Sequence, residues 1–284
     1  MASFTNRATL SYNNVIKNSN IVTGELREVL SMTKTAVTST YSPGDRVTYV
    51  ISIVNSGTTA YTAMTLNDNL GAYVSGAATF IPLSYIDGSV RYYQNGVLQA
   101  QPTVTAGNTL TIQNISIPAS GNVTLVYETE VGTTAPPNVG GQIVNTATLT
   151  GGAMAAPLTA SETIAAGSRP DLTISKSICP STVVENGQLT YTFVIQNSGN
   201  AAATDSDGIV VTDTFDPKLN DISVTLNGNA LSAGVGYTYD QTTGAFSTTE
   251  GVISVPAATF TQDAVSGAYT ISPGVSILVV SGTV

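Results

Sequence analysis

The chain has 284 residues, of which 42% are hydrophobic, so it is long and apolar enough to form two cores and is not a disordered chain. Eighteen acidic residues against nine basic ones give a formal net charge of −9, which excludes a basic surface for nucleic acid. The absence of histidine and the presence of a single cysteine, Cys179, exclude the commonest zinc ligand and any internal disulfide.

Charged residues are scarce, at 10% of the chain against about 25% in an ordinary soluble domain. The abundance of threonine, serine, asparagine, glycine and valine favours β-strands joined by polar turns and is typical of extracellular repeat proteins. Residues 1–4 lack the features of a secretory signal, and no apolar run is long enough to span a membrane. We therefore expect a protein of a cell or spore surface that leaves the cell by another route, such as lysis of a mother cell.

The first 24 residues resemble the end of a domain. The segment Phe4–Leu10 repeats the pattern of Ile143–Leu149, and Asn18–Thr23 resembles Ala160–Ile164. Apolar and polar residues alternate along the first of these segments, as a half-buried strand requires and a free tail does not. The residues on its apolar face are Phe4, Asn6, Ala8, Leu10 and Tyr12. We therefore predict that residues 1–24 are donor strands, a strand pair that completes another domain.

Residues 25–166 form a first unit of alternating strands, with a turn at Ser42–Asp45 and a hairpin signal at Asn95–Gly96. No helical period of useful length occurs between the strands. The predicted strands are 30–36, 46–54, 64–70, two flanking the hairpin signal, 110–117, 122–131 and 143–149.

Residues 167–170 form a linker, and a second unit, residues 171–284, then repeats the first. The offset between the two units is constant, because Lys176 follows Lys34, Tyr191 follows Tyr49 and Gly199 follows Gly57 by the same interval. A second hairpin signal, Asn227–Gly228, corresponds to Asn95–Gly96. The last residues, 274–284, correspond in sequence to residues 121–131 of the first unit. The first unit continues beyond this point and the second does not, so we expect the second unit to lack its closing strands.

The repeated pattern resembles a known family. Each unit begins with a lysine strand, and the first continues with Gly44-Asp45-Arg46-Val47-Thr48-Tyr49, an Asn-x-Gly turn, Asp68-Asn69-Leu70 and Asn145-Thr146-Ala147. This order is similar to the immunoglobulin-like conserved repeat of bacterial surface proteins, a numbered domain of unknown function. The resemblance implies an all-β fold of two tandem Ig-like β-sandwich domains and a surface location, but it says little about activity.

A sandwich without its last strands exposes an apolar groove and an unpaired sheet edge. We predict that the N-terminal strands of one subunit complete the second domain of a neighbouring subunit. A head-to-tail contact of this kind does not close on itself and yields a filament, and the arrangement resembles donor-strand complementation in pilins. The alternative is that Asn6-Arg7-Ala8 belongs to a disordered leader and that the second unit is complete without further strands.

Three polar residues lie on apolar faces in each unit, where a lone polar group is costly. In the first unit these are Lys34, Asp68 and Asn145; in the second they are Lys176, Asp213 and Asn6, the last supplied by the next subunit. Together they resemble the triad of adhesin and pilin domains that form Lys–Asn isopeptide bonds. The resemblance implies neutral lysine as nucleophile and a protonated aspartic acid as its helper. The alternative is a Lys–Asp pair with a hydrogen bond to the asparagine.

Other candidate sites carry weaker signals. The loop Asp205–Gly208 has oxygen ligands but lacks the spacing of a calcium loop and is expected to be a turn. We expect Cys179 to be a small apolar residue near a strand end. Two glycosylation sequons, at Asn114 and Asn122, are common coincidences in such a composition. Three tyrosines, Tyr85, Tyr92 and Tyr93, are expected to serve cross-strand packing rather than a sugar platform.

The sequence therefore predicts a structural subunit of an extracellular or spore-surface fibre, a pilus-like appendage built from copies of itself. We expect no enzyme activity, no metal, no cofactor and no nucleic-acid partner, because no nucleophile–base pair, metal cluster or phosphate loop is present. A further anchor, tip protein or host ligand stays open. The alternative function is a monomeric two-domain adhesin that binds glycan or a host protein.

Overall fold

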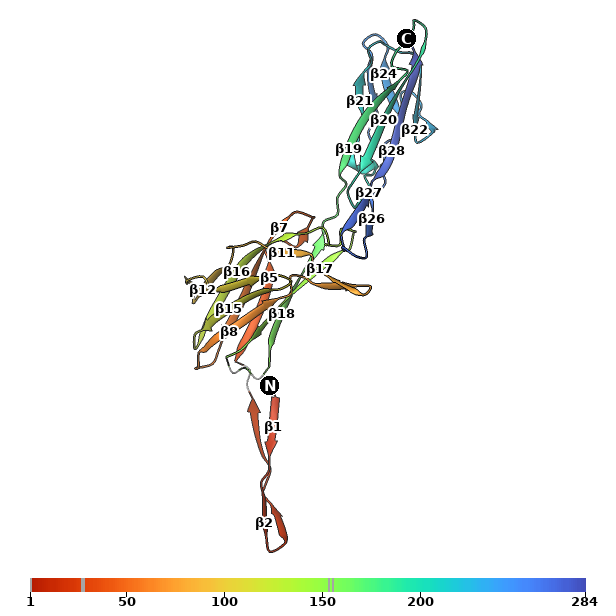
Figure 1. The fold of residues 1–284 in the computed structure, drawn as a ribbon. Coiled ribbons are helices and arrows are strands. Elements are labelled where there is room, and N and C mark those ends of the chain that lie inside the picture. The colour runs from red at the N-terminus through yellow and green to blue at the C-terminus, as the bar shows by residue number, and fades with distance from the viewer. Residues whose placement is uncertain (1, 27–28, 153, 155) are drawn as a thin grey trace.

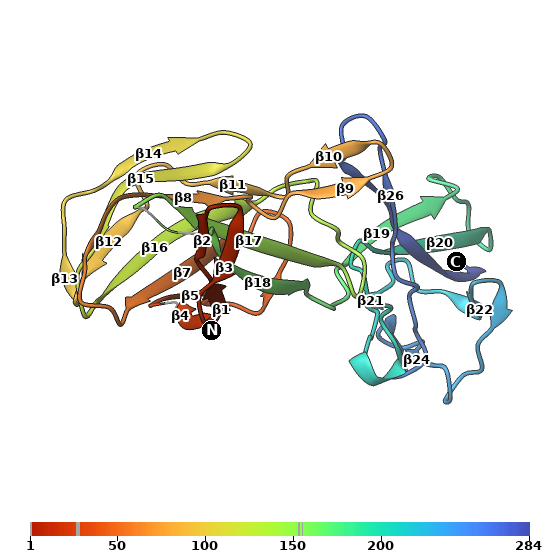
Figure 2. The same cartoon turned by 90° about the horizontal axis from the view of Figure 1, so that it is seen from below.

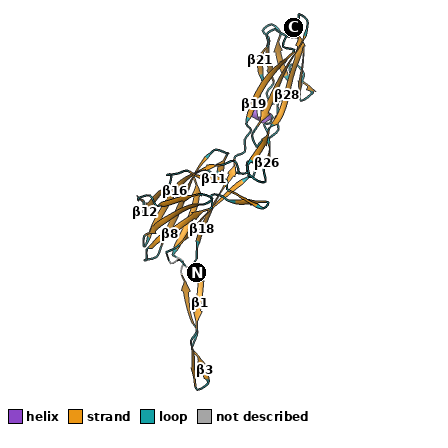
Figure 3. Cartoon of the chain, viewed as in Figure 1, coloured by secondary structure: helices purple, strands orange, loops and turns teal. Residues whose placement is uncertain are grey.

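The computed structural model describes residues 2–26, 29–152, 154 and 156–284. In these ranges nearly all regular structure is β-strand, and the one helical element is a short 3₁₀ turn, η1 (Asp205–Asp207), drawn purple in Figure 3. The strands form two tandem β-sandwich domains of the Ig-like type and an N-terminal hairpin (Figure 1). The all-β prediction is confirmed.

The first domain packs two six-stranded sheets face to face. One sheet consists, in spatial order, of β13 (Val97–Leu98), β12 (Arg91–Gln94), β16 (Gly121–Val131), β7 (Arg46–Asn55) and β5 (Leu30–Ala36), with β11 (Leu83–Tyr85) also paired to β16. The other consists of β14 (Thr103–Ala106), β15 (Leu110–Ile117), β8 (Tyr61–Asp68), β17 (Gln142–Thr150), β18 (Leu158–Ala166) and β6 (Thr40–Tyr41). A separate hairpin comprises β9 (Tyr73–Ser75) and β10 (Ala78–Phe80).

Alternation along the strands places one apolar row of each sheet in the core. On β7 the buried residues are Val47, Tyr49, Ile51 and Ile53, and their neighbours point outward. The strand β16 shows the same alternation over its whole length, paired with β7 from Gly121 to Glu130.

The second domain has a five-stranded sheet that faces a three-stranded one. The larger sheet consists of β19 (Leu172–Cys179), β20 (Gln188–Asn197), β28 (Gly274–Thr283), β22 (Asn220–Leu226) and β23 (Asn229–Ala230). The smaller consists of β21 (Thr212–Thr214), β25 (Ala245–Thr248) and β24 (Tyr237–Asp240). A separate hairpin comprises β26 (Thr259–Gln262) and β27 (Tyr269–Ser272). The core between the sheets contains stacked Tyr191 and Phe215, with ring centroids 4.7 Å apart.

Equivalent residues of the two domains have the same structural roles. The side-chain amide of Asn55 donates to the carbonyls of Thr59 and Pro118, and that of Asn197 donates in the same way to Ala201 and Pro256. Both Asn-Gly signals form hairpin turns with positive φ at both residues, which is the geometry that such turns require. The repeat read from the sequence is therefore a repeat of structure.

Hydrogen bonds join the two domains directly. The Asn200 amide donates to the carbonyls of Gly167 and Pro137, at 2.6 and 2.8 Å. The Gln262 amide on β26 donates to the Tyr73 hydroxyl, and its oxygen accepts from Ser75, so the β26–β27 hairpin is bonded to the β9–β10 hairpin of the first domain. Figure 2 shows these hairpins side by side.

The N-terminal residues form a hairpin that pairs only with itself. It consists of β1 (Ala2–Asn6) paired with β4 (Val22–Leu26), and of β2 (Thr9–Tyr12) paired with β3 (Val15–Asn18). The prediction of one strand from Phe4 to Tyr12 is wrong in one respect, since the strand is interrupted at Arg7 and Ala8. The register changes there, because Asn6 pairs with Val22 but Thr9 pairs with Asn18. The hairpin extends from the end of the first domain that is opposite to the second domain (Figure 1).

Candidate functional site

In the first domain, the hairpin of β17 and β18 closes the sandwich. The strand β17 pairs with β8, with Ala147 opposite Asp68 and Leu149 opposite Leu66. Its inward residues, Ile143, Asn145, Ala147 and Leu149, are fully buried. The strand β18 continues the sheet and lies against β5 of the facing sheet. The side of β8 that faces away from β15 is thereby paired, and the edge strand β5 is covered.

The corresponding strands of the second domain are uncovered. Every residue of β19 is exposed, whereas the equivalent β5 buries its inward residues. The contrast is clearest at one aligned pair, because Ile174 on β19 is 56% exposed and Met32 on β5 is 8% exposed. Among the described residues, no strand covers β19 or pairs with the free edge of β21. We call this region, formed by β19 and β21, the acceptor groove.

The N-terminal hairpin presents the residue types of β17 to solvent. The four residues aligned with the buried row of β17, namely Phe4, Asn6, Ala8 and Leu10, are all exposed, and so is Tyr12. Phe4 is 59% exposed and Leu10 is 62% exposed. A two-stranded hairpin is only marginally stable in water, and apolar side chains on it gain nothing there. The hairpin therefore has the composition of a buried element in an exposed place.

The predicted first triad lies in the core of the first domain. Lys34 Nζ is 2.5 Å from Asp68 Oδ2, and both side chains have no solvent exposure. The Tyr127 hydroxyl donates to the same carboxylate oxygen, and the lysine ammonium lies 4.8 Å from the centroid of the Tyr49 ring. Burial lowers the pKa of Lys34 to about 8, although Asp68 opposes this shift.

Asn145 lies on β17, next to β8 in the sheet that contains Asp68, and faces the sheet that contains Lys34. It is fully buried, and neither its Oδ1 nor its Nδ2 has a hydrogen-bond partner. A buried primary amide without partners is costly and needs an explanation. Sequence reasoning missed the two tyrosines of the cluster, Tyr49 and Tyr127, because a tyrosine in an apolar row looks like ordinary core.

The second triad is only partly assembled within one chain. Lys176 Nζ contacts Asp213 Oδ2 as an ion pair that is not a well-formed hydrogen bond, and the lysine side chain is 40% exposed. The ammonium lies over the Tyr191 ring, as Lys34 lies over Tyr49. Asn6 does not meet this pair, because it lies on the hairpin at the other end of the molecule (Figure 1).

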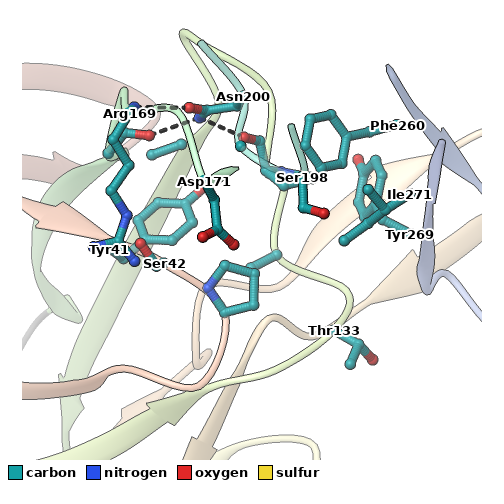
Figure 4. A pocket seen from close by; sticks show the side chains of 16 residues that line it. Tyr41, Ser42, Thr133, Arg169, Asp171, Ser198, Asn200, Phe260, Tyr269 and Ile271 are labelled. Atoms are coloured by element: carbon teal, nitrogen blue, oxygen red, sulfur yellow. Dashed lines mark hydrogen bonds between the residues drawn. The ribbon is translucent and has the colours of Figure 1, made fainter. Parts of the chain in front are cut away.

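A separate cleft of about 330 Å³ lies between the two domains. Figure 4 shows Phe260, Tyr269 and Ile271 on one side of it and Tyr41, Arg169 and Asp171 on the other. The backbone N–H of Arg169 donates to Asn200 Oδ1 at its rim. The cleft is mainly apolar, with one residue of each charge near its opening.

The weaker candidates have structural roles. The loop Asp205–Gly208 contains η1, where the Asp207 carboxylate accepts from the backbone of Thr204 and caps the turn. Tyr92 is buried and bonded to the backbone of Ser116, which confirms its packing role. Cys179 ends β19, as expected, and is exposed. Within the described ranges, no group of three or more histidine, cysteine or acidic residues could hold a metal ion.

In the part of the chain that the structure describes, no helix has the length and apolar character to cross a bilayer.

Comparisons with known proteins give a family match for part of the chain. The CARDB family model matches residues 169–259, which is less than half of the chain and lies mainly in the second domain. A comparison with curated proteins finds no significant match.

Several solved structures are similar to this chain at low identity. The pilus backbone RrgB of Streptococcus pneumoniae is 10% identical with a TM-score of 0.35, over 86% of this chain and 55% of that one. A variant of BcpA, the major pilin subunit of Bacillus cereus, is 11% identical with a TM-score of 0.40, over 96% and 73%. The collagen-binding domain of a Staphylococcus aureus adhesin is 10% identical with a TM-score of 0.30, over 49% and 99%.

Proposed function

We propose that this chain is the structural subunit of an extracellular or spore-surface fibre and polymerises head to tail. The N-terminal hairpin of one subunit fills the acceptor groove of the next, taking the place that β17 and β18 have in the first domain. The observation that carries this proposal is that one chain contains both an exposed hairpin that resembles β17 and two uncovered strands, β19 and β21.

The energetics support this exchange. Burial of Phe4 and Leu10 would contribute roughly 1.5–3 kcal/mol each, and the free edge of β21 would gain ladder hydrogen bonds. Both apolar surfaces, on the hairpin and on β19, are removed from water in one step.

The arrangement of the parts supports an open filament. The hairpin and the second domain lie at opposite ends of the first domain (Figure 1), so a hairpin reaches the groove of another copy and not its own. A head-to-tail contact that does not close generates a linear polymer.

A covalent isopeptide bond is part of the proposal. The neutral amine of Lys34 attacks Cγ of Asn145; the new C–N bond replaces the original amide bond, and ammonia leaves. Asp68, in its protonated form, donates a hydrogen bond to the amide oxygen and relays the proton. Asn145 is fully buried and forms no hydrogen bond with Lys34 or Asp68, which supports this reaction over a hydrogen-bonded Lys–Asp–Asn cluster. Between subunits, the same bond would join Lys176 to Asn6 of the partner subunit, with Asp213 in the place of Asp68.

Mass spectrometry of the denatured chain tests the bond between Lys34 and Asn145. We expect the monomer mass to be lower than the sequence mass by one ammonia, and Asn145→Ala to remove this deficit. The control is Asn114→Ala, which changes an exposed asparagine and keeps the deficit. An unmodified mass for the parent chain would contradict the bond.

Electron microscopy tests the polymer. Filaments are expected from the full chain and not from a chain without residues 1–24, which keeps both domains.

In this proposal the chain is a structural protein and not an enzyme. The alternative is a monomeric adhesin, for which the interdomain cleft would be the binding site; monomers from both chains, with a ligand in the cleft, would favour it.

A further inference from the structure

We infer that the donated hairpin seats in the acceptor groove in a single register, with Thr9 opposite Thr212 and Leu10 opposite Val211, and that Asn6 selects this register. The inference rests on the proposed function and specifies the contacts between two copies of the chain. It makes Asn6 a specificity-determining residue of assembly.

The first domain supplies the template for the register. There β17 runs antiparallel to β8, with Thr148 opposite Asn67 and Leu149 opposite Leu66. Asn145 lies further along β17, in the buried row of the sheet that contains Asp68, and faces the sheet that contains Lys34.

On the acceptor side, the ion pairs fix the equivalence. Lys176 contacts Asp213 and lies over the Tyr191 ring, as Lys34 contacts Asp68 and lies over the Tyr49 ring. Asp213 therefore has the place of Asp68. Counting back along the strands puts Thr212 in the place of Asn67 and Val211 in the place of Leu66.

On the donor side, the sequence fixes the equivalence. Phe4–Leu10 and Ile143–Leu149 share four identical residues, namely Asn6, Ala8, Thr9 and Leu10 in the hairpin. Thr9 then has the place of Thr148, and Leu10 that of Leu149. The two equivalences together give the register stated above, with Ala8 opposite Asp213.

The ion pair provides the reason for one register. A slip by one residue turns the apolar row outward, so the nearest competitor is a slip by two. Such a slip brings Phe4 or Ala8 over the Lys176–Asp213 pair, which then loses water and gains no polar partner. In the aligned register Asn6 meets the pair, and its amide can donate to Asp213 Oδ2, which accepts no hydrogen bond in the single chain.

Seating in this register changes the hairpin. The strands β17 and β18 pair without interruption, whereas the free hairpin is interrupted at Arg7 and Ala8. In the free state the Ala8 N–H donates to the Ser19 hydroxyl. In the groove, Arg7 and Ala8 join β1 and β2 into one strand beside β21.

Paired cysteines test the register in the full chain. In a Cys179→Ser background, Thr9→Cys is combined with Thr212→Cys, and the matched control combines Ser11→Cys with Thr212→Cys. All three positions are exposed in the single chain, so the monomers are expected to fold. Directly opposite residues lie within disulfide range, about 4.5–5.5 Å between Cα atoms, whereas a pair displaced by two residues lies beyond about 7 Å.

We expect the aligned pair to form disulfides between subunits at least tenfold more than the displaced pair, as identified by mass spectrometry of linked peptides. Adding Asn6→Leu to both combinations should bring the ratio toward one, while Thr5→Leu, on the opposite face of the strand, should leave it unchanged. An unchanged ratio in Asn6→Leu would overturn the role of Asn6.

The outcomes separate this inference from the proposed function. Filaments in which the displaced pair reacts as well as the aligned pair would overturn the register but keep strand donation. Filaments in which neither pair reacts would also overturn the register, whereas an absence of filaments would overturn both the register and strand donation.

Discussion

Lys34 and Lys176 have equivalent positions in the two domains, but their surroundings differ. The Lys34 side chain is fully buried between the two sheets, and burial lowers its pKa to about 8. Lys176 retains its carboxylate and its aromatic neighbours but is 40% exposed, because nothing in the single chain covers β19. A hairpin seated in the acceptor groove would bury Lys176 and so remove this difference in exposure.

The pKa of Lys34 gives a prediction for Asn145→Ala, in which the lysine must remain a free amine. Between pH 8 and about 10 the unfolded chain binds more protons at this lysine than the folded chain, so stability rises with pH. Above about pH 10 tyrosines ionise in the unfolded chain, and stability falls because burial raises the pKa of Tyr127. We expect the melting temperature of the first domain in this variant to rise from pH 8 to 10 and then decline.

The parent chain provides the comparison. With Lys34 converted to an amide it has no amine to titrate, so its melting temperature should not rise between pH 8 and 10. An equal rise in both proteins would mean that Lys34 stays a free amine, which contradicts the isopeptide bond.

At the scale of elements, β5 and β19 have closely related sequences but different environments. Met32 and Ile174 are aligned, and one is buried while the other is exposed. We expect Ile174→Asp to abolish filament formation and to leave the melting temperature of the monomer unchanged within about 1 °C, since nothing packs on it in the single chain.

The matched change in the first domain should act differently. Met32→Asp buries a charge in a closed sandwich and should unfold the first domain or lower its melting temperature by more than about 10 °C. Light scattering and thermal denaturation of both variants check this contrast. Filaments from Ile174→Asp at the parental rate would argue against β19 as part of the groove.

Most strands and both Asn-Gly hairpins could be predicted from the sequence, because period-2 alternation and turn residues are local signals. The Lys34–Asp68 contact could also be predicted, since two polar residues in apolar rows must find partners. The interruption at Arg7 and Ala8 could not, because the residues continue the strand pattern and the break arises from the register across the hairpin. The contact of Gln262 with Tyr73 and Ser75 joins distant segments and leaves no local signal.

At the scale of the whole molecule, the charge is unevenly distributed. Residues 1–24 carry Arg7 and Lys17 and no acidic residue, whereas residues 171–284 carry two lysines and ten acidic residues. Opposite charges on two docking parts steer their encounter and raise the association rate, and salt screens the effect. The sign of the charge on each part therefore favours hairpin and second domain as partners.

This asymmetry predicts that assembly slows as salt rises. The initial rate, followed by light scattering, should fall about tenfold or more between 20 and 500 mM NaCl. Arg7→Gln combined with Lys17→Gln should lower the rate at low salt and flatten the dependence. A rate that rises steadily with salt in both proteins would indicate association through apolar surfaces without steering.

The most direct test of the account is the structure of the filament by electron cryomicroscopy. The account predicts that residues 2–26 of each subunit lie between β19 and β21 of the next, with density continuous along β1 and β2 and with Asn6 beside Lys176. A filament in which the hairpin stays free in solvent, or packs elsewhere while β19 remains uncovered, would contradict strand donation as the basis of assembly.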